Sequence, residues 1–182
     1  MFLLDNIRLL CYIINMILGI DVSTSKIGYC IIDDNQNLLE VHFKKLKEDT
    51  LEEKAWMFFC NELKEVQRKY KITQVRIEEP FTMFSGGKTT AGTMAKLQRF
   101  NGMVSLMAYH CFKMVPVLVP SRSARSKCGI KIKRGENTKK KIIEWVEQRY
   151  PKDFTVELTR HGNPKPGTDD MADSIVVALS HF

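Results

Sequence analysis

The sequence predicts an α/β fold: a central mixed five-stranded sheet with helices on both faces. Three short apolar runs follow one another closely in the first third of the chain, which is typical of adjacent antiparallel strands. Beyond Thr50, segments with helical periodicity alternate with two further apolar runs, which is typical of strands joined by helices. The predicted order of elements is β-β-β-α-β-α-β-α-α, without an internal repeat.

The first three strands are separated only by short turns. "MILGIDVS" begins at Met16 and ends just after an acid, and "TSKIGYCIIDD" alternates in polarity before a turn at Asp33-Asp34-Asn35. "NLLEVHFKKL" supplies the third strand. Apolar runs this close together predict an antiparallel meander.

The hydrophobic period then changes to that of helices. Apolar residues recur at helical spacing from Leu51 to Val66, and "TQVRIEEP" predicts a buried strand that Pro80 ends. A glycine-bearing loop, "FTMFSGGKTTAG", precedes a long helix from about residue 90 to 112. "MVPVLVP" predicts the fifth strand, "TKKKIIEWVEQRYP" a helix, and "DDMADSIVVALSHF" the last helix.

The length of 182 residues suits one domain with a substantial core, and 44% hydrophobic with 27% charged residues indicates a soluble globular protein. We assign residues 16–182 to this single domain and residues 1–15 to an N-terminal extension of uncertain order. Asp5 and Arg8 interrupt the apolar extension, which argues against a membrane span, and a clear signal-peptide cleavage region is missing. Met16, where the first well-formed strand starts, is a candidate natural start.

The net charge of +7 is concentrated in one segment. Nine Lys or Arg and one Glu lie between Ser121 and Lys141, a balance of +8 that leaves −1 for the rest of the chain. Such a patch suggests a polyanionic partner, although a solvated lysine-rich loop has the same composition.

The cysteines indicate a reducing compartment, which we take to be the cytoplasm. Their number is odd and no two of them form a C-x-x-C pair, which argues against a zinc site or a disulfide framework. They are Cys11, Cys30, Cys60, Cys111 and Cys128.

The last helix is apolar but carries acids in its first turn and a half. Asp170 and Asp173 are three residues apart and share a helix face, so a cation between them would relieve their repulsion. The alternative is helix capping by Asp169 or Asp170 together with a surface acid at Asp173.

Two further acids stand at the ends of predicted strands. Asp21 ends the first strand and Glu78 the fourth, although acids are depleted in strands. Each has an alternative role, Asp21 as a turn residue and Glu78 as an exposed edge acid. If the two strands are neighbours, their acids converge near Asp170 and Asp173. Four carboxylates in one cleft would bind two divalent cations, Mg²⁺ or Mn²⁺, and such a pair hydrolyses phosphodiesters.

Three stretches resemble the RuvC family of Holliday junction resolvases, within the RNase H-like superfamily: "LGIDVSTSKIGYCIID", "RIEEPF" and "DDMADSIVVAL". The resemblance runs from about Met16 to the C-terminus. It implies an RNase H-like fold with Asp21, Glu78, Asp170 and Asp173 as catalytic metal ligands for two Mg²⁺ per active site, which Mn²⁺ would replace. The neighbouring Glu79 and Asp169 could shift this assignment by one residue.

The resemblance also implies DNA contacts. Phe81 matches a family aromatic that wedges at the junction centre, with core packing as its alternative role. Lys139 resembles a catalytic lysine near the scissile phosphate, and Lys127 matches a second such lysine. The expected DNA-binding set is Phe81, Arg122, Arg125, Lys127, Lys131, Lys133, Arg134, Lys139 and Lys140.

The family relationship implies a homodimer that acts on branched DNA, with the helix at about 90–112 as the dimer element. Gly92, Ala95, Gly102 and Ala108 would permit close approach of a partner helix, whereas the alternative is a core helix with one buried side. Two-fold symmetry would let two active sites nick paired strands symmetrically. The loop "SGGKTTAG" and the basic loop are the chain's own, and they suggest a phage or viral member that acts in the host cell cytoplasm.

The expected activity is therefore that of a crossover junction endodeoxyribonuclease, a metal-dependent, structure-selective enzyme for four-way junctions. One alternative is an RNase H-like nuclease acting on flaps, forks or RNA–DNA hybrids, because the metal chemistry is shared. A second is an ATP-binding protein of the actin and sugar-kinase type, whose phosphate loop resembles "GIDVSTSKIGYCIID", although the chain is short for its two domains. A third is a junction-binding protein without catalytic activity.

Overall fold

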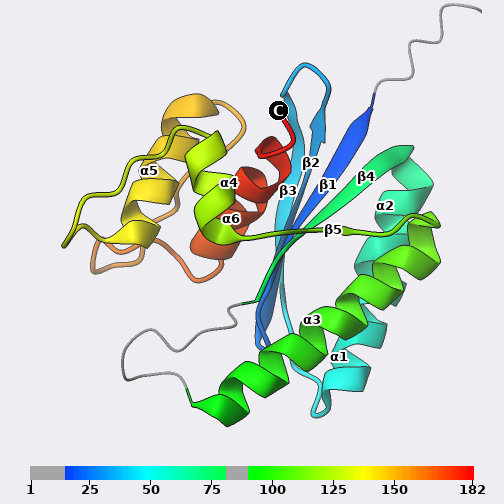
Figure 1. The fold of residues 1–182 in the computed structure, drawn as a ribbon. Helices are drawn as coiled ribbons and strands as arrows, with labels where there is room; N and C mark the ends of the chain where they lie inside the picture. The colour runs from blue at the N-terminus through cyan, green and yellow to red at the C-terminus, as the bar shows by residue number, and fades with distance from the viewer. Residues whose placement is uncertain (1–14, 81–89) are drawn as a thin grey trace, which may run out of the picture.

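The computed structural model describes residues 15–80 and 90–182, whose core is a five-stranded mixed sheet (Figure 1). Its strands lie in the order β3-β2-β1-β4-β5, with β1 antiparallel to β2, β2 antiparallel to β3, and β4 parallel to both β1 and β5. The predicted meander and the expected pairing of the first and fourth strands are both confirmed. The strands are β1 (Met16–Val22), β2 (Lys26–Asp33), β3 (Leu38–Lys45), β4 (Ile72–Glu78) and β5 (Val117–Val119).

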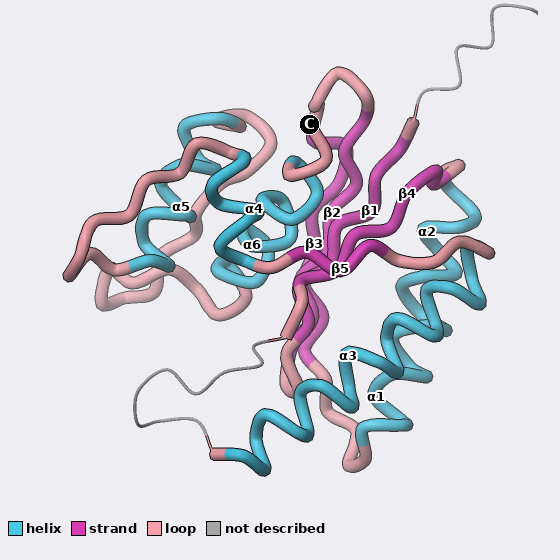
Figure 2. Tube along the Cα trace, viewed as in Figure 1, coloured by secondary structure: helices cyan, strands magenta, loops and turns pink. Residues whose placement is uncertain are grey.

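Helices cover both faces of the sheet, as predicted (Figures 1 and 2). One face carries α1 (Leu51–Phe58), the π-helical segment η2 (Phe59–Leu63), α2 (Lys64–Lys69) and α3 (Ala91–Phe112). The other face carries α4 (Ser121–Lys127), α5 (Thr138–Arg149) and α6 (Thr168–Leu179). The predicted order is confirmed apart from α4, which the sequence did not predict because "SRSARSK" contains a single apolar residue and therefore shows no apolar stripe.

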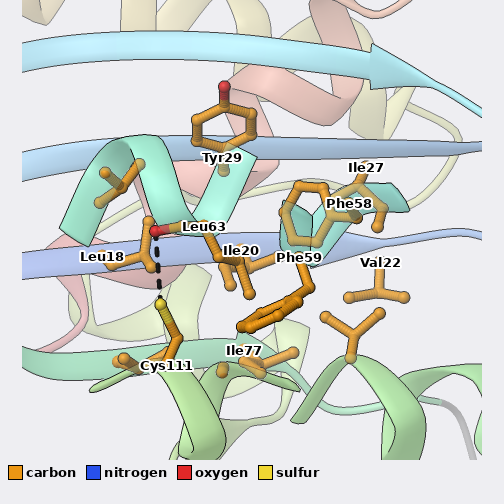
Figure 3. Packing of buried hydrophobic residues seen from close by; sticks show 14 of the residues in the cluster. Leu18, Ile20, Val22, Ile27, Tyr29, Phe58, Phe59, Leu63, Ile77 and Cys111 are labelled. Carbon is orange, nitrogen blue, oxygen red and sulfur yellow. Dashed lines mark hydrogen bonds between the residues drawn. The ribbon is translucent and has the colours of Figure 1, made fainter. Parts of the chain in front are cut away.

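The face covered by α1 to α3 is a closed apolar core. Alternate residues of β1, from Leu18 to Val22, point into it and meet Phe58, which is fully buried (Figure 3). Helix α3 contributes Phe100 and Ala108, both fully buried. Ala108 was expected to allow close approach of a partner, and this expectation is wrong because the residue packs inside its own domain.

The opposite face of the same strands holds α6 at very short range. A Cβ atom added to Gly19 in β1 would lie 2.7 Å from the Cβ of Ala178 in α6, so only glycine allows this approach. The buried Arg76 of β4 donates hydrogen bonds to the backbone carbonyls of Val177 and Ser180 at the end of α6. Helix α6 is therefore fixed across the middle of the sheet.

No helix within residues 15–80 and 90–182 is long and apolar enough to cross a membrane.

Candidate active site

Three of the four predicted acids meet at one point of the α6 face. Asp21 near the end of β1, Glu78 at the end of β4 and Asp173 in the second turn of α6 each offer a carboxylate oxygen, and these oxygens all lie within 4.8 Å of one another. Successive side chains of a strand point to opposite faces of the sheet. Leu18 of β1 and Ile77 of β4 are therefore buried on one face, and the acids Asp21 and Glu78 point to the other. The expected convergence of the strand ends is present in the structure.

Glycine brings the start of α6 onto the sheet beside these acids. Gly28 pairs with Asp21 across β1 and β2, and a Cβ atom on Gly28 would lie 2.1 Å from the backbone oxygen of Asp170. Gly167 forms the N-cap with a φ of 97°, a left-handed conformation that favours glycine. No side-chain hydrogen bond caps α6, and Asp169 and Asp170 lie in its first turn, where their charges face the positive end of the helix.

Asp170, the fourth predicted ligand, lies outside the three-acid group. Its carboxylate forms an ion pair with Lys26 at 2.5 Å, and the Lys26 ammonium is also 3.6 Å from Asp169. Lys139 forms a second ion pair with Asp169. The first turn of α6 therefore carries two acids that two lysines neutralise.

The three acids are protonated more readily than ordinary carboxyl groups. Burial and the charge of Glu78 raise the pKa of Asp173 to about 7, and Lys139 and Arg125 only partly oppose this shift. Burial raises the pKa of Asp21 well above its usual value, and the negative charges of Glu78 and Asp173 add to that effect. Burial also raises the pKa of Glu78, against a hydrogen bond from Ser121. The ionised forms of these carboxylates are therefore unfavourable, and a bound cation would stabilise them.

The pKa of Asp169 is shifted in the opposite direction. Although burial opposes ionisation, the hydrogen bond and charge of Lys139 hold the pKa of Asp169 at about 2. The pKa of Lys26 is raised despite the opposing effect of burial, because it is hydrogen-bonded to Asp170 and lies next to Asp169. Lys26 and Lys139 therefore stabilise the ionised form of Asp169, whereas burial and the charge of Asp169 raise the pKa of Asp170.

Residues that the sequence did not reveal fix the position of Glu78. The hydroxyl of Ser121, the first residue of α4, donates a hydrogen bond to Oε1 of Glu78. Asn101 of α3 donates from Nδ2 to the Glu78 backbone carbonyl at 2.9 Å. Ser121, Asn101 and Lys26 are all distant from their partners in sequence, and no local motif marks them.

The donor set fits a hard divalent cation. The three acids offer only carboxylate oxygens, the ligands that Mg²⁺ and Mn²⁺ prefer, and their close spacing matches a shared cation. Within the described part of the chain, none of the three forms an ion pair with a Lys or Arg at 4.0 Å or less. Asp21, Glu78 and Asp173 therefore form an acidic cluster suited to a metal.

The predicted DNA-binding residues fall into groups at different distances from the acids. Arg125 and Lys139 are close enough for their charges to lower the pKa of Glu78 and Asp173. Arg122, Arg125 and Lys131 line a cavity of about 390 Å³ between α4 and α5, and Lys139 and Lys140 line a cavity of about 580 Å³ that borders Asp169. Lys133 and Arg134 are exposed in the loop between α4 and α5.

Lys127 lies elsewhere. Its ammonium donates to the backbone carbonyl of Ser180, at the end of α6 opposite to Asp170 and Asp173. Asp173 and Ser180 are seven residues apart, about 10 Å along the helix, so this lysine contacts the end of α6 and not the acidic cluster. Phe81 falls outside the described residues.

The sheet order, the helices on both faces and the acids at the ends of neighbouring strands define an RNase H-like domain with an acidic metal-type centre. No family model matches the sequence. Crossover junction endodeoxyribonuclease RuvC of Aliarcobacter butzleri (strain RM4018) is 27% identical over 91% of this chain and 96% of its own length. RuvC of Campylobacter curvus (strain 525.92) is 26% identical over 91% of this chain and 94% of its own length. Over nearly its whole length the chain is similar in sequence to these RuvC proteins.

Solved structures show the same fold. Thermus thermophilus RuvC in complex with a Holliday junction substrate superposes with a TM-score of 0.64 at 17% identity, over 92% of both chains. The yeast mitochondrial Holliday junction resolvase Ydc2 gives a TM-score of 0.55 at 15% identity, over 90% of this chain and 76% of the resolvase. The predicted RNase H-like fold is confirmed.

Proposed function

We propose that this chain is a divalent-metal-dependent endonuclease that resolves four-way DNA junctions by paired symmetrical nicks. The observation that carries the proposal is the grouping of Asp21, Glu78 and Asp173, with oxygens within 4.8 Å of one another. The RuvC relatives and the Holliday junction resolvase structures support this choice of substrate. The basic segment beside the acids supplies the positive charge that a DNA substrate requires.

The acids hold the metal in this proposal. Asp21, Glu78 and Asp173 bind one Mg²⁺ or Mn²⁺, and Asp170 joins them as a ligand of a second ion. When bound, these ions supply a water of lowered pKa and stabilise the leaving oxygen of the phosphodiester. Lys139, which lies beside Asp169, stabilises the charge on the transferred phosphate.

The basic residues bind DNA phosphates. Arg122, Arg125 and Lys131 line one cavity beside α4, and Lys140 lines another beside α5 that borders Asp169. Binding of this kind weakens steeply with salt, because each neutralised phosphate releases counterions. We retain Lys133 and Arg134 as exposed phosphate contacts and Phe81 as the wedge at the junction centre. Lys127 is the weakest member of the proposed set because it contacts the end of α6 and not the acids.

A homodimer through α3 is part of the proposal. One side of α3 is buried in the domain at Phe100 and Val104, whereas the opposite side is exposed and carries small and apolar residues. Leu106 is 61% exposed and Tyr109 48% exposed. The exposed stripe consists of Ala95, Arg99, Gly102, Leu106 and Tyr109 at spacings of three and four residues. A partner helix would cover this stripe.

The decisive experiment compares substrates and variants in one assay. The purified protein is given a synthetic four-way junction, a flap, a fork and an RNA–DNA hybrid, each with Mg²⁺, Mn²⁺ or EDTA. We expect paired symmetrical nicks in the junction, dependence on metal, and a loss of at least about a thousandfold for Asp21→Asn. Asp153→Asn, an exposed acid, serves as the matched control and retains activity.

Two outcomes contradict the proposal. Cleavage of the hybrid or the flap in preference to the junction favours the alternative RNase H-like nuclease. Robust junction cleavage by Asp21→Asn removes the assignment of the acids as metal ligands. The cytoplasmic location and the phage or viral origin stay predictions, and the four free cysteines among the described residues support the former.

A further inference from the structure

The ammonium group of Lys26 lies against the carboxylate of Asp170. Its nitrogen lies 2.5 Å from Oδ2 of Asp170 and 3.6 Å from Oδ1 of Asp169. Lys139 already pairs with Asp169, so Lys26 supplies the second positive charge for this pair of acids. Asp170 therefore has little unbalanced negative charge left with which to attract a divalent ion.

We propose that Lys26 is a positioning residue that competes with the second divalent cation for Asp170, so that the two ions load in sequence. The inference rests on the metal centre of the proposed function and goes beyond it. The three-acid group, which has no ion pair among the described residues, takes the first ion. Asp170 becomes a ligand only after Lys26 is displaced from it.

Backbone contacts fix the position of Lys26 beside Asp170. Lys26 is the first residue of β2, and its carbonyl accepts hydrogen bonds from both the amide and the hydroxyl of Ser23, each at 2.9 Å. Two residues further on, Gly28 packs directly against the backbone of Asp170. The Lys26 side chain is only 25% exposed, so the ammonium is kept next to the acid and is not an ordinary surface counter-ion.

A structural role predicts the opposite effect on metal binding. If Lys26 serves only to offset repulsion between Asp169 and Asp170, its removal would distort the first turn of α6 and weaken metal binding. If it competes for Asp170, its removal takes away a positive charge a few ångströms from the second ion and strengthens binding. The sign of the change in metal affinity therefore separates the two roles.

The test measures Mn²⁺ binding to the DNA-free protein by isothermal titration calorimetry. We expect two binding steps in the unmodified protein, and Lys26→Gln makes the weaker step tighter by on the order of tenfold. Lys26→Arg, which keeps the charge, leaves the weaker step near its original affinity. Asp170→Asn removes that step whether residue 26 is Lys or Gln. Lys152→Gln, an exposed lysine after the end of α5, is the control and changes neither step by more than about twofold.

An unchanged or weaker second step in Lys26→Gln overturns the proposal, and so does the absence of Mn²⁺ binding in every variant. If thermal unfolding in EDTA shows that Lys26→Gln is not folded, Lys26→Met keeps the aliphatic stem and gives the same comparison. Failure of this proposal can be distinguished from failure of the proposed function. If the Mn²⁺ binding steps shift as expected but the protein does not cleave the junction, the role of Lys26 is supported and the choice of substrate is contradicted.

Discussion

The two faces of the sheet are built from the same strands but serve different purposes. Under α1 to α3 the face is largely apolar, from Leu18 in β1 to Ile77 in β4, with the Tyr29 hydroxyl hydrogen-bonded to Glu62. Under α6 the same strands present Asp21, Arg76 and Glu78. Because side chains alternate along a strand, one side of each strand packs under α1 to α3, and the other packs under α6, where the charged groups lie beside a second apolar cluster that includes Ile17 and Ile32.

This division explains how the protein tolerates clustered acids. Burial raises the pKa values of Asp21, Glu78 and Asp173, and neighbouring negative charges add to this for Asp21 and Asp173, so their ionisation opposes folding in the absence of metal. The closed core on the opposite face supplies stability that does not depend on those acids. Substitutions on the first face should therefore change stability alone, whereas substitutions on the second should also change metal binding.

Phe58→Ala tests the first half of this comparison and has the largest expected effect. Phe58, the last residue of α1, is fully buried in the core, and removing its ring should lower the free energy of unfolding by about 3–5 kcal/mol. Urea denaturation with and without Mn²⁺ measures this loss. The folded fraction should still bind Mn²⁺ with unchanged affinity. A large change in that affinity would mean that the two faces are not independent.

Gly28→Ala tests the contact that joins the second face to α6. A methyl group at Gly28 would lie 2.1 Å from the Asp170 backbone oxygen, so the start of α6 must move, at a cost of about 1–3 kcal/mol. Because Asp170 and Asp173 move with it, metal affinity should also fall. Gly92→Ala in the first turn of α3, where the new Cβ meets its nearest atom at 3.9 Å, is the matched control. Equal effects of the two substitutions in thermal melts and Mn²⁺ titrations would contradict this account.

Asp173→Asn tests how the acids of the second face change the stability of the protein with pH. The pKa of Asp173 is about 7 in the folded, metal-free protein, above the value of about 4 for an unfolded chain. Between these values the folded state binds the extra proton, so this carboxyl lowers stability increasingly as the pH rises from about 4 to 7, and the effect levels off above that. Melting temperatures in EDTA should therefore show an advantage of Asp173→Asn that grows over this range.

Mn²⁺ gives the control for that pH series. With the metal present, the unmodified protein should regain stability at pH 7 because the cation binds the ionised carboxylate, whereas Asp173→Asn should gain less. An advantage of the variant that stays constant from pH 4 to 7 in EDTA would show that Asp173 titrates normally.

Sequence patterns predicted the sheet and the convergence of its acids because both follow from local periodicity. The alternation in β1 and β4 is a property of consecutive residues, and the spacing of Asp170 and Asp173 places both on one helix face. The pairing of β1 with β4 then brings Asp21 and Glu78 together. This part of the site could be predicted from the order of the strands and the face to which each side chain points.

The rest of the site depends on contacts that no local pattern encodes. Helix α4 is short and buries only Ser121 and Ala124, so its sequence lacks the apolar stripe that marks a helix. The pairing of Lys26 with Asp170 depends on how closely α6 approaches β2, which Gly28 determines. Lys127 matched a family lysine by its place in the sequence, but the turn of α4 directs it to the far end of α6.

Ser121→Ala has the smallest expected effect and tests whether α4 belongs to the site. The Ser121 hydroxyl is the hydrogen-bond donor to Oε1 of Glu78, and it opposes the rise of the Glu78 pKa. Its loss should lower the free energy of unfolding by only about 1 kcal/mol, because one hydrogen bond is removed. Metal affinity should fall by about tenfold, since a carboxylate ligand without its orienting partner spends less time in the binding position. Ser123→Ala, an exposed serine of the same helix, should leave both quantities unchanged in the same titrations. If both serine variants bind Mn²⁺ like the unmodified protein, α4 only covers the sheet edge, and the acids alone set the affinity of the site.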